Sequence, residues 1–215
     1  MTWRIFHGNR TATLVGIVAL LCIVGGIASV TSGLRDQRSV PNVENIGSLD
    51  PKNLKPAAAF LPYAEPVTID IPSVSIHSPL ITVGKTDSGS IAVPEAPNFD
   101  KAAWYRHSPT PGQYGVSVIV GHVDSYADND GASVFYSLPS VKPGQKINIT
   151  RADGATASFT VYALRQYDKA TLPSGEVYEP KQQAAELRLI TCSGPFDTAS
   201  GTYRDNTVVF ARLTD

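Results

Sequence analysis

Short β-favouring runs separated by proline and glycine constrain this chain more than any other feature. Its 215 residues include 16 prolines and 17 glycines, which interrupt regular structure wherever they occur. The segments between them are rich in valine, isoleucine and threonine, a pattern typical of short strands joined by tight turns. We therefore expect an all-β domain with only short helical turns.

About eight segments carry the strand pattern, and this number favours a closed barrel over an open sheet with exposed edges. Ala152-Asp153-Gly154 separates two of them and is a strong hairpin signal. A helical turn is expected at 181–186. The expected strands are 67–72, 79–84, 88–94, 116–124, 145–151, 155–165, 187–192 and 206–213.

An apolar stretch near the N-terminus predicts a membrane-spanning helix at 12–32, after a cytoplasmic tail at 1–11. No charged residue occurs from Thr11 to Gly33. The stretch from Ala12 to Val30 is continuously apolar or small, and as a helix its nineteen residues would cover roughly 28 Å, close to the hydrocarbon thickness of about 30 Å. A cleaved signal peptide is the alternative, although its apolar part is usually only about 7–15 residues long.

The remaining chain is expected on the outer side of the cell membrane, in a single-pass arrangement. No acidic residue precedes Asp36, so the N-terminal tail is biased towards the cytoplasm. Residues 33–65 contain scattered prolines and little periodicity, which predicts a flexible stalk. The β-domain itself is expected at 66–215.

Charge and acidic motifs argue against two classes of ligand. The net charge is −1 and the lysines and arginines are scattered, so there is no electrostatic footprint for nucleic acid. The acidic loop 124–131 does not fit a calcium loop, because aligning Gly131 with the invariant glycine puts Tyr126 and Ser137 where carboxylates are needed. No metal or cofactor is expected.

Cys192 is the candidate reactive residue. It ends the apolar strand 187–192, where alternation puts Leu187, Leu189 and Thr191 on one face and Arg188, Ile190 and Cys192 on the other. The only other cysteine, Cys22, lies in the apolar N-terminal stretch. The thiol therefore has no disulfide partner in its own domain, and a strand end would hold it fixed yet reachable.

His122 is the best candidate base for this thiol. A free cysteine has a pKa near 8.5 and is only a few per cent thiolate at neutral pH, so it needs a partner. His122 ends the strongly apolar part of the expected strand 116–124, and Gly121 beside it is expected to leave room for a substrate backbone. The alternative is a histidine whose ring is satisfied by Asp124 or by a backbone carbonyl.

An arginine could stabilise the oxyanion that forms when a thiol attacks a carbonyl. Arg204 begins the closing strand, and antiparallel pairing would bring it towards Cys192. Arg188 lies about 13 Å back along the cysteine strand, which is too far for the same oxyanion. Three other arginines are expected to be solvated: Arg106, Arg165 and Arg212.

From about Pro66 onwards the sequence resembles the sortases, most closely class F of actinobacteria. The resemblance rests on four motifs: Ile71-Pro72-Ser73-Val74, Gly121-His122-Val123-Asp124, Leu189-Ile190-Thr191-Cys192 and Tyr203-Arg204-Asp205-Asn206. It implies an eight-stranded sortase barrel and a cysteine transpeptidase. Such an enzyme cleaves a Leu-Pro-any-Thr-Gly-type sorting-signal peptide between Thr and Gly and transfers the acyl group to a cell-wall precursor or pilin amine.

The same resemblance assigns the nucleophile to Cys192, the acid/base to His122 and the oxyanion-stabilising arginine to Arg204. In many sortases this arginine lies closer to the apolar core of the last strand, in a register that falls on Asn206 here. Arg204 lies two residues earlier, on the same face of a regular strand.

Two other readings remain open. One is a membrane-tethered β-domain that binds a cell-wall or pilus component without chemistry. The other is a different cell-wall cysteine enzyme, such as an L,D-transpeptidase. Those enzymes carry histidine and glycine shortly before the cysteine, where this chain has Leu189-Ile190-Thr191.

Overall fold

The computed structural model describes residues 40–214, except 42, 53, 126–130 and 181–182. The tail expected at 1–11, the membrane helix expected at 12–32 and the start of the stalk expected at 33–65 all lie outside the described residues. Within the described part of the chain, no helix has the length and apolar character needed to cross a membrane.

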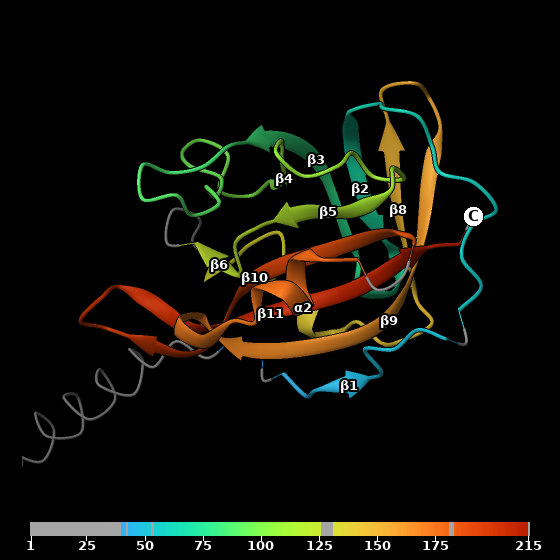
Figure 1. Cartoon of the computed structure of the whole chain (residues 1–215). Coiled ribbons are helices and arrows are strands. Elements are labelled where there is room, and N and C mark those ends of the chain that lie inside the picture. The colour runs from blue at the N-terminus through green and yellow to red at the C-terminus, as the bar shows by residue number, and fades with distance from the viewer. Residues whose placement is uncertain (1–39, 42, 53, 126–130, 181–182, 215) are drawn as a thin grey trace, which may run out of the picture. The chain divides into compact units, whose positions relative to one another are not determined.

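Eight strands close into a barrel, as predicted (Figure 1). Their order around the barrel is β9-β11-β10-β5-β4-β3-β2-β8, and β8 pairs again with β9. The pairs β3–β4 and β5–β10 are parallel, and the others are antiparallel. The strands are β2 (Pro66–Ile71), β3 (Ile76–Val83), β4 (Ala102–Tyr105), β5 (Gly115–Val120), β8 (Lys146–Arg151), β9 (Thr156–Asp168), β10 (Ala185–Asp197) and β11 (Thr202–Leu213).

The remaining elements are short. A strand β1 (Ile46–Gly47) pairs with β9, and β6 (Asp124–Ser125) pairs with β7 (Gly131–Ala132). The described helices are the 3-10 turns η1 (Pro72–Val74), η2 (Leu138–Ser140) and η3 (Lys169–Thr171), and the five-residue helix α2 (Ser174–Tyr178).

Two of the expected elements are wrong, although the barrel is right. The segment 88–94 forms only an isolated bridge between Lys85 and Ile91, and β4 takes its place as a barrel strand. The helical turn expected at 181–186 is absent from the described part of that range, because Ala185 and Glu186 begin β10. The helix forms earlier, as α2.

The cysteine strand also runs further than the Ser-Gly-Pro sequence suggested. β10 continues to Asp197 and pairs with β11, with a register shift between Ser193 and Phe196. Gly194 lies in this bulge with φ of 74°, a backbone conformation that glycine adopts without strain.

The described part of the range expected to be a stalk lies against the barrel. Arg165 donates to the backbone carbonyls of Ile46 at 2.5 Å and Gly47 at 2.9 Å. Further along, the amide of Ala57 donates to the carbonyl of Leu213 at 3.0 Å. These hydrogen bonds, with the packing of Ile46, Ala57 and Leu61 against the core, fix a segment that its composition alone would leave flexible.

Alternation along β10 divides its side chains between two apolar layers, as predicted. Leu187 and Leu189 belong to the cluster that fills the barrel. Ile190 belongs to a second cluster on the outer face, with Val118 of β5 and Phe210 of β11. Both faces of β10 are therefore covered, and the strand that carries Cys192 is rigid.

A buried ion cluster anchors the start of β10. The carboxylate of Glu186 accepts from Arg188 at 2.5 Å, from Arg212 at 3.1 Å and from the hydroxyl of Tyr162 at 2.9 Å. All three ionic side chains are at most 1% exposed. The Arg188 guanidinium also lies 4.5 Å from the centre of the Phe210 ring.

This cluster corrects the expectation that Arg212 is solvated. Its partner Glu186, expected in the helical turn 181–186, lies instead in β10. Pairing of opposite charges lets both groups enter the core. Burial, followed by the nearby Glu186 carboxylate, raises the pKa of the Tyr162 hydroxyl against the lowering effect of Arg188.

Replacing Glu186 with glutamine is expected to lower the free energy of unfolding by about 3–5 kcal/mol, because two buried arginines lose their counter-charge. Tyr162→Phe removes one hydrogen bond and should cost only about 1 kcal/mol. Urea unfolding of the two variants measures both. Equal midpoints for Glu186→Gln and the unmodified chain would contradict this role of the cluster.

Candidate active site

Cys192 lies on the outer face of the barrel, at the end of the regular part of β10. It is partly buried, and it is opposite Asn206 in the antiparallel pairing with β11. The bulge begins immediately after it. A Cβ atom at Gly194 would lie 2.3 Å from an Asp205 carboxylate oxygen, so glycine is required for the backbone to turn there.

Parallel pairing brings His122 to the same edge of the barrel as Cys192. The last pair in register is Val120 of β5 with Ile190 of β10. The amide of Gly121 then donates to the carbonyl of Ile190 at 3.2 Å. His122 and Cys192 each follow two residues after that pair, on neighbouring strands that run in the same direction.

The imidazole of His122 is held by the loop that precedes β4. Its Nε2 lies 2.7 Å from the carbonyl oxygen of Pro94, and its ring makes an edge contact with Phe99 at 5.6 Å between centroids. A carbonyl only accepts hydrogen bonds, so Nε2 carries the proton in this arrangement. Nδ1 is left as the nitrogen that can take up or release a proton.

The Pro94 carbonyl is therefore the backbone carbonyl expected as one of the two alternative hydrogen-bond partners of the His122 ring. The other, Asp124, accepts instead from the hydroxyl of Tyr203 at 2.5 Å. This contact joins the segment after His122 to β11, one residue before Arg204. The ends of β5, β10 and β11 are therefore tied together at one edge, while His122 and Cys192 form no direct hydrogen bond in the described structure.

The three residues considered for stabilising the oxyanion, Arg204, Asn206 and Arg188, lie in different parts of the structure. Asn206 faces Cys192 directly across the β10–β11 pair, and Arg204 lies two residues closer to the hairpin tip, exposed and opposite the bulge. Arg204 contributes to the lowered pKa of Asp197, whose main cause is the backbone amide of Ala199. Arg188 is fully buried and committed to Glu186, so it is unavailable to the site.

Lys169 is a site residue that the sequence did not indicate. It begins η3, directly after β9, and its Nζ lies 3.4 Å from the sulfur of Cys192. The same Nζ lies 3.0 Å from the hydroxyl of Thr202. A lysine 23 positions before the cysteine has no local signal, and only the barrel closure brings the two together.

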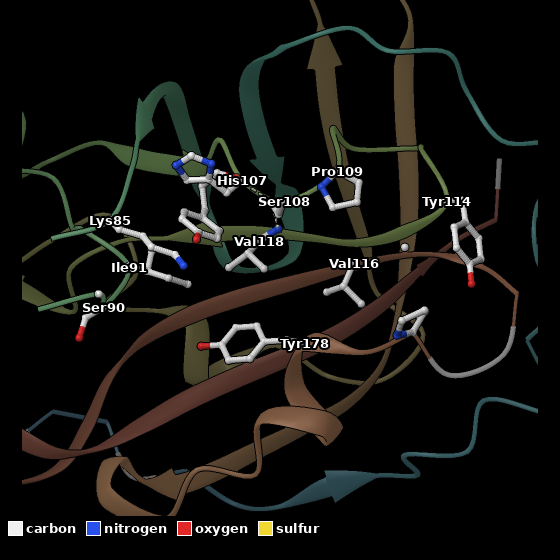
Figure 2. A pocket seen from close by; sticks show the side chains of 14 residues that line it. Lys85, Ser90, Ile91, His107, Ser108, Pro109, Tyr114, Val116, Val118 and Tyr178 are labelled. Atoms are coloured by element: carbon white, nitrogen blue, oxygen red, sulfur yellow. Dashed lines mark hydrogen bonds between the residues drawn. The ribbon is translucent and has the colours of Figure 1, made fainter. Parts of the chain in front are cut away.

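A cavity of about 670 Å³ lies on the outer face of the barrel (Figure 2). Val116 and Val118 of β5 line it, with Tyr178 of α2 across from them. These valines share the outer face with Val120, so β5 leads from the cavity towards His122. At about 3.3 Å per residue, Val118 and His122 are roughly 13 Å apart along the chain.

The described residues contain no group of three or more His, Cys, Asp or Glu side chains able to hold a metal ion. The site combines the thiol of Cys192, the imidazole of His122 with a fixed tautomer, and the cationic side chains of Lys169 and Arg204. These are the components of nucleophilic attack on a carbonyl followed by proton transfer to a leaving amine.

A sortase-domain family model matches residues 69–214. The fold is similar to the lid mutant of sortase A from Corynebacterium diphtheriae, with a TM-score of 0.51, 22% identity, and coverage of 78% of this chain and 75% of that one. It is also similar to sortase C1 from Streptococcus agalactiae in complex with MTSET, with a TM-score of 0.52, 16% identity, and coverage of 69% and 68%. No match is found among curated proteins.

The expectation that Gly121 leaves room for a substrate backbone beside His122 is wrong. A Cβ atom there would lie 2.7 Å from Cδ2 of Phe135 and 2.8 Å from Cγ1 of Val134. The residue is a glycine because the segment that carries His122 packs closely on these two side chains.

Gly121→Ala is expected to lower the free energy of unfolding by about 1–3 kcal/mol through overpacking, and to shift the His122 ring resonances in NMR spectra. Gly175→Ala is the matched control, because a Cβ atom at that position meets only ordinary contacts, from 3.7 Å. Unchanged stability and His122 resonances in Gly121→Ala would show that the close packing does not position the imidazole.

Proposed function

Because the chain belongs to the sortase family and is a cysteine transpeptidase, we propose that it cleaves a Leu-Pro-any-Thr-Gly-type sorting signal between Thr and Gly. The acyl group would pass to an amine of a cell-wall precursor or a pilin. The observation that carries the proposal is the parallel pairing of β5 with β10, which directs His122 and Cys192 to one edge of the barrel.

In the proposed reaction, the Cys192 thiolate attacks the threonine carbonyl carbon and a C–S bond forms. The C–N bond to glycine breaks, and the leaving amine takes a proton from the His122 imidazolium. Nδ1 is the nitrogen suited to this transfer, since Nε2 donates to the Pro94 carbonyl. In the second half, the acceptor amine loses a proton to His122, forms the new C–N bond and releases Cys192 as the thiolate.

Arg204 would stabilise the oxyanion formed in both halves. It shares a face of β11 with Asn206, the residue opposite Cys192, and it is exposed. A guanidinium supplies permanent charge and several N–H donors to an anionic oxygen.

The cavity beside β5 is the proposed binding site for the acyl-donor peptide. Its lining combines apolar Val116, Val118 and Ile91 with the rings of Tyr105 and Tyr178. Apolar walls with a few polar atoms suit the leucine and proline of a sorting signal. The strand β5 then gives an extended peptide a direct course towards the thiol.

We propose that the protein is a class F sortase, on the combined resemblance of the four motifs at 71–74, 121–124, 189–192 and 203–206. We also propose that it is anchored in the cell membrane through residues 12–32, with the barrel on the outer side. The uncharged stretch from Thr11 to Gly33 supports this location. An outward position would give the thiol access to surface proteins and to cell-wall amines.

Incubation with a sorting-signal peptide is expected to give a thioester on Cys192, detected by mass spectrometry as a hydroxylamine-labile acyl adduct. Cys192→Ala and His122→Ala should abolish peptide turnover, measured with a fluorogenic sorting signal. Cys22→Ala is the matched control and should retain full activity. Full turnover in Cys192→Ala would refute the proposed function.

Arg204→Lys is expected to lower turnover much more than peptide affinity, because loss of an oxyanion donor costs roughly 3–4 kcal/mol in the transition state. Separate kcat and KM values for Arg204→Lys and Asn206→Ala measure this difference. A normal kcat for Arg204→Lys, together with a lost kcat for Asn206→Ala, would transfer the oxyanion role to Asn206.

A further inference from the structure

Among the described residues, the Cys192 sulfur has one hydrogen-bond contact, with the ammonium of Lys169. The two atoms are 3.4 Å apart. The turn η3 holds the lysine backbone in place, since the Asp168 carboxylate accepts from the amide of Ala170 at 2.8 Å. Asp168 itself is paired with Asp205 of β11, so Lys169 starts from a fixed point of the barrel.

The lysine amine is also tied to the hairpin of β10 and β11. Its Nζ lies 3.0 Å from the hydroxyl of Thr202. Thr202 is on the same face of β11 as Arg204 and Asn206. Asn206 in turn lies opposite Cys192. Two anchor points therefore hold the amine over the outer face of the hairpin, with the sulfur as one of them.

A lysine ammonium has three donors and no acceptor, so it can only donate to the sulfur. A positive charge at this distance attracts negative charge on the sulfur or on an anionic group that approaches it. The His122 ring contacts Pro94 and Phe99 instead of the sulfur. Lys169 is therefore the cation in contact with the resting nucleophile, and His122 remains free for proton transfer.

We propose that Lys169 is a further catalytic residue, whose ammonium contacts the Cys192 sulfur and stabilises the negative charge on that atom when it attacks the substrate. Its part in peptide cleavage rests on the proposed function. In that reaction Lys169 keeps its proton throughout: the sulfur forms the C–S bond, the C–N bond breaks, and the His122 imidazolium supplies the proton of the leaving amine. Formation of the neutral thioester then removes the anionic partner of Lys169.

The test uses two alkylating reagents on the full chain with Cys22→Ala, so that only Cys192 reacts. Iodoacetate is an anion and iodoacetamide is neutral, and a cation beside the sulfur favours the anion. The fraction of Cys192 that is ionised and the exposure of its sulfur affect both reagents alike. The ratio of the iodoacetate rate to the iodoacetamide rate at one pH therefore reports the charge near the sulfur. Lys169→Met should lower this ratio about fivefold, as expected for one unit charge near 4 Å in a solvated site.

Lys169→Arg is expected to restore the ratio, because it restores the charge. Lys52→Met is the matched control and should leave it unchanged, since Lys52 is exposed and pairs with Asp50. Urea unfolding of each variant confirms that the barrel is intact. An unchanged ratio in a folded Lys169→Met variant, or a lowered ratio that Lys169→Arg does not restore, would overturn the proposal.

No sorting signal enters the alkylation experiment, so its result is independent of the proposed function. Peptide turnover is then measured on the same variants. We expect Lys169→Met to lower kcat and Lys169→Arg to recover most of it. If the unmodified chain cleaves no sorting signal while the rate ratio still depends on Lys169, the proposed function fails and the role of Lys169 as the cation beside the Cys192 sulfur stands.

Discussion

The parallel pairing of β5 with β10 is the constraint on which the rest of the site depends. Two neighbouring strands that run in the same direction end at the same edge, so the residues that follow them are delivered together. Here the register places Val120 beside Ile190, two residues before His122 and Cys192. Antiparallel pairing of these strands would instead send the two segments to opposite ends of the barrel.

The elements around this pair hold it in place. The Glu186 ion cluster fixes the start of β10, and apolar layers cover both of its faces. At the other end, the contact of Tyr203 with Asp124 joins the segment after His122 to β11. The site therefore combines the thiol of Cys192 on a rigid strand with the imidazole of His122 on a short segment that the Tyr203–Asp124 hydrogen bond holds.

Local patterns in the sequence were enough to predict the barrel and the two faces of β10. They also placed His122 just beyond the end of β5, whereas Cys192 ends only the regular part of β10, which continues to Asp197. Strand alternation and turn residues carry that information. They did not predict β4, because its Ala-Ala-Trp-Tyr sequence has no polar alternation and is defined by burial between β3 and β5. The contact of Lys169 with Cys192 and the packing of Ile46 and Leu61 on the barrel core depend on contacts between distant segments, which no local pattern records.

The most direct measurement of this account is cross-linking between positions 122 and 192. In the full chain with Cys22→Ala and His122→Cys, a short bifunctional thiol reagent should join the new cysteine to Cys192 within one molecule. Mass spectrometry of the digested protein identifies the joined peptides. The account predicts a high yield of this cross-link in dilute protein; separate modification of the two cysteines, with no link between them, would contradict it.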